Sequence, residues 1–418
     1  MLIIIVRLIE IASRAGVVIL PIYFGLTLPD VGVYNTLLAL ISLFAFAFNF
    51  ERHYDIQRRS AGESQPYFDR KVTDAVYFYG FNYLVMMPVF IAAVAIETHI
   101  AMALIGAVAV IVIGEHLCTQ TYQFAMVNAR YLTLQLVVPF RNLLTLAALG
   151  GLYWHDHGRL SLAELLGVWA GCSALTLGVI AVIWLSIRAP SPRIEPFSLQ
   201  SVIFAQHRAS FTHFLIGMVA MLIIQGDRLM LPNLLSKDLV GIYARHGTVV
   251  SFGYQLFNIM SNNRILPEVF RLTRHGELEA GRRICLREWL RVVTATVALA
   301  VVLTLANWLT HGVYAEKFHI HPDFLLLMLC GFVIRAVADL NALPLNAVHR
   351  ERVILRNQLV AFIVVVVLML TLTPLLGILG TILATLSGAA LYATLNLKAV
   401  NDLRQSPVMT FAAQDVAR

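Results

Sequence analysis

Charged side chains interrupt several long apolar runs of this sequence, and they are the residues best suited to chemistry. Five are arginines deep within their runs: Arg14, Arg141, Arg228, Arg245 and Arg335. Four acids occupy the same kind of position: Glu10, Glu115, Asp227 and Asp339. An ion near the centre of a lipid bilayer costs roughly 2.5–3.5 kcal/mol on insertion scales, so such residues need a structural or functional reason.

The arginines suit the binding of a negatively charged headgroup. A guanidinium keeps its charge, and its forked donors match phosphate oxygens. At about 1.5 Å per residue, Arg14, Arg141 and Arg335 lie roughly 15–18 Å into their runs, near the middle of a roughly 30 Å hydrocarbon core. We expect these three, together with Arg228 and Arg245 nearer the outer surface, to be cations of a substrate cavity.

Charge pairing inside a packed helix bundle is the alternative for the same arginines. Arg14 lies four residues after Glu10, and Asp339 lies four residues after Arg335, which places each pair on one helix face. Asp227 can pair with Arg245 across helices. Arg141 has no acid within one turn of its own run, so pairing explains it least easily.

The four acids are also candidates for binding a coupling ion. Transport driven by a proton or a sodium ion needs an intramembrane acid whose occupancy changes. Asp339 is favoured over Glu10, Asp227 and Glu115, because its neighbour Arg335 can exchange the carboxylate for a substrate phosphate.

The composition places all of these residues in a membrane protein. Of the 418 residues, 59% are hydrophobic and only 13% are charged, about half the charged fraction of a soluble domain. The mean hydropathy is +0.76. Since a spanning helix takes about 20 residues, the chain is long enough for about a dozen.

The apolar runs predict an all-α protein with twelve transmembrane helices. The predicted spans are 3–25, 31–51, 72–95, 101–122, 131–153, 161–186, 209–232, 239–262, 289–310, 323–345, 353–373 and 377–399. The first run is too long, and carries too many charges, for a cleavable signal. Asp30 can cap the second span, and Ser161 with Glu164 forms a capping box that opens the sixth.

The distribution of basic residues predicts the orientation. Of the 31 Lys and Arg residues, 22 fall in the loops after even-numbered spans or in the C-terminal tail, and three fall in the opposite loops. Basic loops stay cytoplasmic, so both termini are expected there. The net charge of +7 therefore reflects topology, and no nucleic-acid partner is expected.

Enzyme and metal sites find little support in the sequence. There is no GxSxG, HExxH, Walker or DxD motif, and no loop is long enough for a catalytic domain. The four cysteines lie far apart and are expected to be core thiols. The HxH pairs His155–His157 and His319–His321 are expected to be solvated loop residues. We therefore expect no metal and no cofactor.

A short motif recurs six spans apart. Leu28-Pro-Asp30-Val-Gly32-Val-Tyr34 precedes the second span, and Leu235-Ser-Lys-Asp238-Leu-Val-Gly241-Ile-Tyr243 precedes the eighth. An even separation gives both halves the same orientation, and so two parallel six-helix repeats with a substrate path between them. The expected organisation is an N-terminal lobe (1–187), a Pro-rich cytoplasmic linker (188–208), a C-terminal lobe (209–400) and a cytoplasmic tail (401–418).

With these features the chain resembles the polysaccharide-transporter branch, which includes O-antigen flippases, of the multidrug/oligosaccharidyl-lipid/polysaccharide (MOP) exporter superfamily. The most specific part is the Asp227-Arg228 pair before the Leu-Ser turn and Gly-x-Tyr. The resemblance implies twelve helices around a central cavity. It also implies a flippase that moves polyprenyl-pyrophosphate-linked oligosaccharide across the bacterial inner membrane for O-antigen, capsule or exopolysaccharide synthesis. The partners it implies are that lipid-linked substrate, the phospholipid bilayer, and a polysaccharide polymerase with its chain-length machinery.

Two other functions stay open at this stage. A cation-coupled multidrug antiporter of the same superfamily would favour an acidic cavity, whereas arginines outnumber acids in these spans. A membrane-embedded polymerase or acyltransferase would resemble chains with a large extracytoplasmic loop, which this sequence lacks.

The predicted orientation can be tested by cysteine labelling. In a background without the four native cysteines, we expect an impermeant maleimide to label Ser236→Cys in intact cells and to leave Ser191→Cys unlabelled until the cells are opened. Labelling of Ser191→Cys from outside would reverse the topology.

Overall fold

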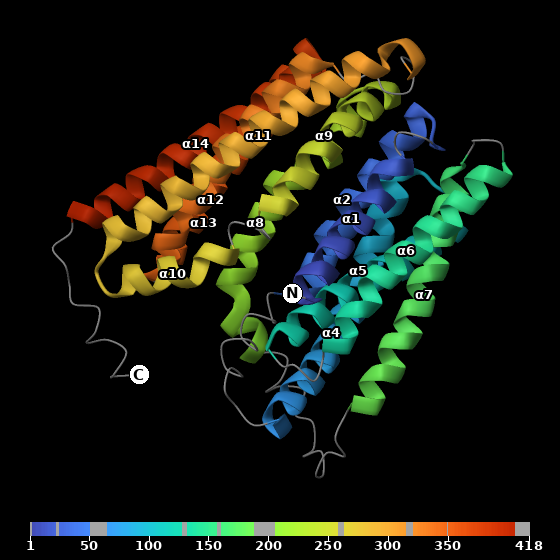
Figure 1. The fold of residues 1–418 in the computed structure, drawn as a ribbon, viewed down its shortest axis with the longest axis horizontal. Helices are drawn as coiled ribbons and strands as arrows, with labels where there is room; N and C mark the ends of the chain where they lie inside the picture. The colour runs from blue at the N-terminus through green and yellow to red at the C-terminus, as the bar shows by residue number, and fades with distance from the viewer. Residues whose placement is uncertain are drawn as a thin grey trace. The chain divides into compact units, whose positions relative to one another are not determined.

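The computed structural model describes residues 2–21, 25–50, 65–127, 132–156, 160–187, 205–257, 263–314, 321–348 and 350–405. These residues form 13 helices and contain no strand (Figure 1). The chain divides into two compact units, residues 1–221 and 222–418, and the division falls inside one long helix.

The N-terminal unit contains six long helices and the first half of a seventh. The six are α1 (Leu2–Leu20), α2 (Leu28–Asn49), α4 (Gln65–Thr98), α5 (Met102–Val127), α6 (Leu132–His155) and α7 (Leu162–Ile187). The seventh, α8, runs over Ala205–Leu234. Within this unit α1 packs on α6, α5 packs on α7, and α2 packs on α4 and α5.

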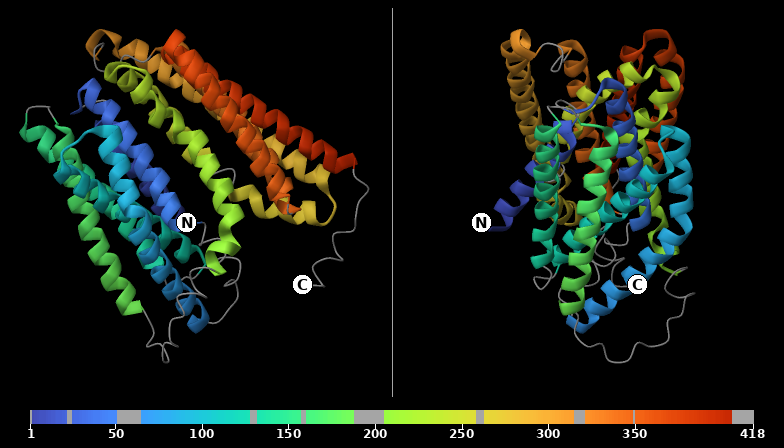
Figure 2. Two further views of the ribbon diagram at one scale, coloured as in Figure 1. Left: turned by 180° about the vertical axis from the view of Figure 1, so that it is seen from behind. Right: turned by 90° about the vertical axis from the view of Figure 1, so that its right-hand side faces the viewer.

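The C-terminal unit contains the second half of α8 and six further helices. These are α9 (Lys237–Phe257), α10 (Asn263–Arg274), α11 (Leu278–Tyr314), α12 (Pro322–Ala347), α13 (Glu351–Leu376) and α14 (Ile378–Gln405). α14 runs alongside both α12 and α13 (Figure 2). α10 packs against α11 and α12.

Twelve of the 13 helices correspond one to one with the predicted spans, and all but α10 exceed 18 residues. Within the described residues, nine of them are long and apolar enough to cross a membrane. The other three long helices, α1, α9 and α12, are those that carry Arg14, Arg245 and Arg335. Buried charges are not confined to these three helices, because Glu115, Arg141 and Arg228 lie on α5, α6 and α8.

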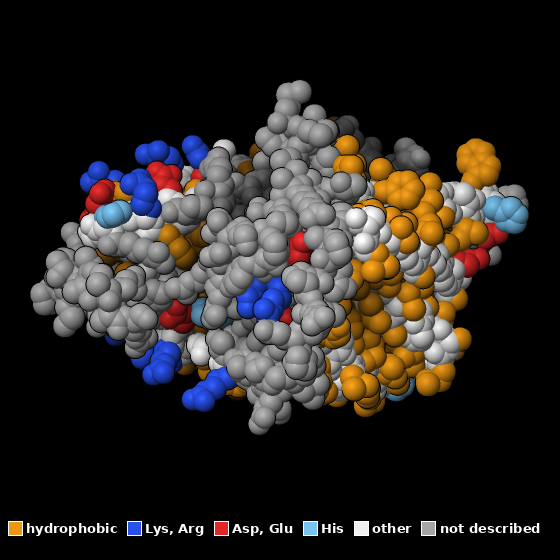
Figure 3. Space-filling view, turned by 90° about the horizontal axis from the view of Figure 1, so that it is seen from below, with side chains coloured by type: hydrophobic (Ala, Val, Ile, Leu, Met, Phe, Trp, Pro, Cys, Tyr) orange, Lys and Arg blue, Asp and Glu red, His pale blue; other side chains and the backbone are white. Residues whose placement is uncertain are grey.

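The outer faces of the helices are apolar. Large side chains such as Leu84, Val89 and Ile96 of α4 are exposed, as lipid-facing residues are. Seen from below, hydrophobic side chains cover much of the right-hand side of the described surface, with uncharged groups between them (Figure 3).

α10 is an element that the predicted spans did not include. Its apolar residues Ile265, Val269 and Leu272 recur at helical spacing and are buried, whereas Glu268 and Arg271 are exposed. The helix escaped prediction because it is short and, on average, polar. The turn after α10 contains Gly276 with φ of 82°, a conformation that glycine adopts without strain. The charged stretch that follows is also helical, so α11 begins at Leu278 and not near residue 289.

Two predicted helix starts can be compared with the structure. The capping box is confirmed: the backbone N–H of Ser161 donates to Glu164 Oε2 at 2.7 Å, and the N–H of Glu164 donates to Ser161 Oγ at 3.2 Å. Asp30 does not cap α2. Thr27 is the N-cap residue, and its Oγ1 accepts a hydrogen bond from the backbone N–H of Asp30 at 3.4 Å.

The start of α8 is held inside the N-terminal unit by aromatic contacts. The His207 ring lies 4.6 Å from Phe50 and 4.5 Å from Phe78, measured between centroids. Phe214, two turns later, stacks on Phe50 at 3.9 Å. Contacts of this kind stabilise beyond the burial of area alone, so the first half of α8 is a structural part of this unit.

The repeated tyrosines are both buried, and each bonds back to the preceding helix. The Tyr34 hydroxyl donates to the backbone carbonyl of Val17 on α1 at 3.3 Å. The Tyr243 hydroxyl donates to the carboxylate of Asp227 on α8. Tyr34 thus links α2 to α1, and Tyr243 links α9 to α8. The acceptor is a backbone carbonyl in the first case and an ionisable side chain in the second.

Candidate functional site

The charged residues of the N-terminal unit meet at Glu115 on α5. Glu115 Oε1 lies 2.7 Å from Arg141 Nη2 on α6, and Oε2 lies 3.6 Å from Arg14 Nη2 on α1. A single carboxylate therefore joins three helices.

Arg141 is held on every side of its guanidinium. Besides Glu115, its Nε and Nη2 donate to Asn142 Oδ1 at 3.3 and 3.0 Å, and its Nη1 donates to Cys118 Sγ at 3.5 Å. The side chain is only 2% exposed. The acid that meets it comes from a neighbouring helix, which the sequence alone does not reveal.

Arg14 differs from Arg141 in its exposure. Its side chain is 46% exposed, so its contact with Glu115 at 3.6 Å is the weaker of the two ion pairs. Glu10 lies one turn earlier on the same helix and is half-buried. Arg14 is thus the more accessible of the two arginines that meet Glu115.

A cavity of about 140 Å³ lies within the C-terminal unit between α8, α9, α12 and α14. Its polar lining consists of Asp227, Arg228, Tyr243, Ser251, Tyr254, Arg335 and Thr385. Its apolar lining includes Ile223, Leu327, Met328, Phe332, Ile382 and Leu386. Packed interiors contain few voids much larger than a water molecule, so this space is a candidate ligand site.

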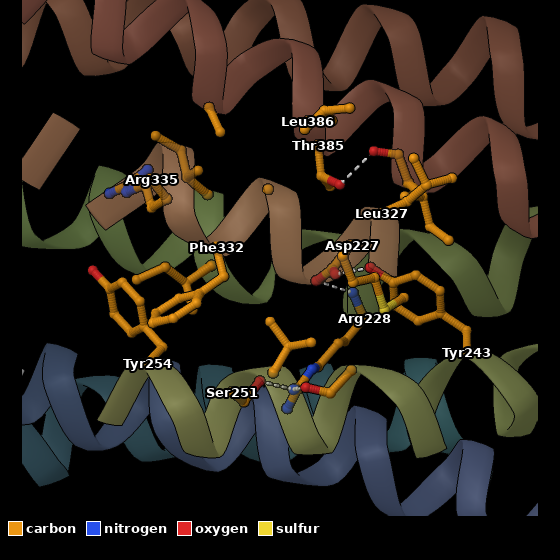
Figure 4. A pocket seen from close by; sticks show the side chains of 18 residues that line it. Asp227, Arg228, Tyr243, Ser251, Tyr254, Leu327, Phe332, Arg335, Thr385 and Leu386 are labelled. Atoms are coloured by element: carbon orange, nitrogen blue, oxygen red, sulfur yellow. Dashed lines mark hydrogen bonds between the residues drawn. The ribbon is translucent and has the colours of Figure 1, made fainter. Parts of the chain in front are cut away.

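One end of the cavity is organised around Asp227. Its carboxylate accepts the Tyr243 hydroxyl and, at 2.8 Å, the backbone N–H of Arg228. The Arg228 guanidinium turns to α9, where Nη2 donates to Ser251 Oγ and, at 3.4 Å, to the carbonyl of Gly247 (Figure 4). The expected pair of Asp227 with Arg245 stays a prediction.

The other end of the cavity is organised around Arg335. Its Nε lies 3.2 Å from Asp339 Oδ1, which confirms the predicted pair one turn apart. Asp339 Oδ2 also accepts the Tyr254 hydroxyl at 2.6 Å. The guanidinium carbon lies 4.8 Å from the ring centroid of Tyr392, a cation–π distance.

Arg335 keeps one donor group free among the described residues. Its side chain is 9% exposed, yet its buried Nη1 has no hydrogen-bond partner. A buried donor of a charged group without a partner is costly. Such a group, on the wall of a cavity, is a natural contact for an anion.

The structure thus sorts the predicted residues into separate groups. Arg228, Arg335 and Asp227 line the cavity, and Asp339 backs it. Glu115, Arg141 and Arg14 form their own group in the N-terminal unit. Arg245 is buried on α9 and is absent from the described lining of the cavity.

The residues on the α9 side of the cavity were not predicted to belong to a site. Tyr243, Gly247, Ser251 and Tyr254 recur at intervals of four, four and three residues, which places them on one helix face. Tyr243 belongs to the repeated motif, but none of the four residues carries a charge that would mark it as part of a site.

The histidine pairs give no metal site in the part of the chain that can be described. No group of three or more His, Cys, Asp or Glu converges there. The backbone N–H of His321 donates to His246 Nε2 at 2.9 Å. His157 and His319 lie outside the described residues.

No family model and no curated protein matches this sequence. Solved structures do match the fold. The lipid II flippase MurJ in an inward closed conformation matches with a TM-score of 0.69 and 12% identity, over 98% of this chain and 89% of that chain.

Multidrug transporters match the same fold. An inward-facing multidrug resistance MATE family transporter of the MOP superfamily matches with a TM-score of 0.64 and 10% identity, over 96% of both chains. A Vibrio cholerae MATE transporter matches with a TM-score of 0.56 and 12% identity, over 97% of this chain and 94% of that chain. The chain therefore has the twelve-helix fold of MOP transporters, which confirms the predicted fold class.

The Glu115 group predicts a stability effect. Glu115→Gln removes the carboxylate that meets the buried Arg141, and losing one partner of a buried ion pair costs about 3–5 kcal/mol. We expect a lower melting temperature and lower abundance in detergent extracts. Arg14→Gln, at the exposed partner, is the control and should change the melting temperature little. Equal melting of Glu115→Gln and the parent would contradict a structural role for this pair.

Proposed function

We propose that this protein flips a polyprenyl-pyrophosphate-linked oligosaccharide across the bacterial inner membrane, for the synthesis of O-antigen, capsule or exopolysaccharide. The observation that carries the proposal is the Arg335 guanidinium on the wall of the cavity, which is buried and whose Nη1 has no hydrogen-bond partner in the described part of the chain. It occurs in a fold shared with a lipid II flippase.

The chemistry of Arg335 supports a phosphate ligand. An arginine in a protein does not lose its proton, so its charge must be met in every state of the transporter. Asp339 meets part of it through Nε, which leaves Nη1 to a ligand. Phosphate oxygens fit a guanidinium fork. Arg228 places a second cation on the same cavity.

We assign contact with the headgroup phosphate first to Arg335. Arg228, at the other end of the same cavity, is proposed as a further cation of the path. Arg14 is half-exposed and is proposed to meet the substrate on its way across the membrane, with Arg245 as a further cation of the path. Arg141 is proposed to act indirectly, by holding Glu115 in place, because its own donors are already engaged by protein groups.

The proposed function also includes an orientation in the membrane and partner proteins. The termini face the cytoplasm, as the 22 basic residues of one side indicate. The protein is a transporter and not an enzyme, and it hands its substrate to a polysaccharide polymerase and chain-length machinery. A membrane-embedded polymerase or acyltransferase remains the least supported alternative, because none of its motifs occurs in the sequence.

A cation-coupled multidrug antiporter is the second candidate. Two acids, Asp227 and Asp339, lie at or behind opposite ends of the cavity, and multidrug transporters share the fold. The two candidates differ in substrate charge. In vesicles, the flippase moves a fluorescent lipid-linked oligosaccharide and ignores a cationic dye, whereas the antiporter does the reverse.

Substitution of Arg335 tests its role in transport. We expect Arg335→Ala to leave abundance nearly unchanged and to abolish flipping of the fluorescent lipid-linked oligosaccharide, with Arg335→Lys restoring part of the rate because it keeps the charge and loses the fork. If Arg335 serves only to pair Asp339, Arg335→Ala instead leaves Asp339 without its ion-pair partner and lowers abundance. The double change Arg335→Ala with Asp339→Ala then restores both abundance and transport. Restored transport in that double variant would refute headgroup contact by Arg335.

Asp339 is the proposed site of coupling, ahead of Asp227, Glu115 and Glu10. Asp339 accepts hydrogen bonds from both Arg335 and Tyr254, so a phosphate that takes over Arg335 leaves its carboxylate available to a proton or a sodium ion. In vesicles, we expect Asp339→Asn to flip at a rate that no longer rises when a proton or sodium gradient is imposed. The assignment is wrong if the variant responds to the gradient as the parent does.

A further inference from the structure

The cavity of the C-terminal unit is long and mostly apolar. On α9 its lining runs from Tyr243 to Tyr254, which at about 1.5 Å per residue is roughly 16 Å along the helix. Figure 4 shows Asp227, Arg228 and Tyr243 at one end, and Arg335, Tyr254 and Phe332 at the other. Aliphatic side chains cover much of the remaining wall.

This lining does not suit an oligosaccharide. Sugars present many hydroxyl groups, and a hydroxyl buried without a partner is costly. The hydroxyls on the wall are already engaged: Tyr243 with Asp227, Tyr254 with Asp339, and Thr385 with the carbonyl of Ile382. The wall between the two ends suits an apolar chain instead.

Arg335 adds a requirement for negative charge at one end. Its Nη1 is a buried donor with no partner among the described residues. Tyr392 under the guanidinium and Asp339 at Nε hold the group in place. An amphiphile with an anionic head and a slender apolar chain matches both features at once.

We infer that this cavity binds the lipid carrier at its phosphate, with the phosphate on Arg335 and the first isoprenoid units along Leu327, Met328 and Leu386. The sugars stay outside it. The inference rests on the proposed function and adds which part of the substrate the C-terminal unit recognises. It makes recognition at this site independent of the sugar sequence.

Three probes separate the head from the chain. Farnesyl diphosphate carries both, inorganic diphosphate carries only the head, and farnesol carries only the chain. Using the purified full chain in non-ionic detergent, we expect farnesyl diphosphate to bind at least tenfold more tightly than either of the others. Equal affinity for farnesol and farnesyl diphosphate would overturn the inference.

A cavity-filling variant tests the position of the chain. Ala389 lines the cavity and is buried, whereas Ala390 beside it on α14 is exposed. We expect Ala389→Leu to keep the melting temperature of the parent and to weaken farnesyl diphosphate at least tenfold, while Ala390→Leu changes neither. If the two variants bind farnesyl diphosphate alike, the chain is not in this cavity.

The head is tested at Arg335. Arg335→Gln should lower the affinity for farnesyl diphosphate to that for farnesol and should leave farnesol binding unchanged. A variant that keeps the preference for farnesyl diphosphate contradicts the assignment.

Flipping by the parent protein separates the two proposals. A parent that flips the fluorescent lipid-linked oligosaccharide but does not bind farnesyl diphosphate refutes this inference and leaves the proposed function standing. A parent that binds farnesyl diphosphate through Arg335 and Ala389 but flips nothing refutes the proposed function and retains the ligand of the cavity.

Discussion

A guanidinium inside an apolar helix bundle must have its charge met, because it cannot shed its proton and cannot reach water. The packing of both units depends on this constraint. Arg141 is satisfied entirely by protein groups, with Glu115 at 2.7 Å and three further hydrogen bonds. Arg335 is satisfied only in part, by Asp339 and the face of Tyr392. The same chemistry therefore gives a fully engaged arginine in one unit and, among the described residues, an arginine with an open donor in the other.

In the C-terminal unit, residues of α9 make the hydrogen bonds that fix the charged groups around the cavity. Tyr243 bonds to Asp227 and Ser251 bonds to Arg228, both on α8, while Tyr254 bonds to Asp339 on α12. These polar contacts lie at the two ends of the cavity, and between them its lining is mainly aliphatic. The arrangement is an apolar cavity with charged groups at both ends, Asp227 and Arg228 at one and Arg335 at the other. The donor of Arg335 that has no partner among the described residues favours an amphiphilic anion at that end.

Much of the fold could be predicted from the sequence, because the bilayer demands long apolar helices. Twelve predicted spans correspond to twelve helices. α10 could not be found by that rule, since its apolar residues cover only one face. Pairs within one helix, such as Arg335 and Asp339, were predictable from spacing. The contact between Arg141 and Glu115, and the role of Tyr254, depend on which helices pack together, which spacing does not reveal.

The central claim is that an anionic lipid carrier enters the C-terminal unit beside Arg335, and photo-crosslinking tests it most directly. A diazirine-bearing isoprenoid diphosphate, irradiated with the purified protein and mapped by mass spectrometry, should attach to cavity residues of α12 and α14 such as Met328 and Leu386, and excess farnesyl diphosphate should suppress the adducts. Adducts confined to exposed residues of α11, such as Val297 and Val301, with none in the cavity, would contradict the account.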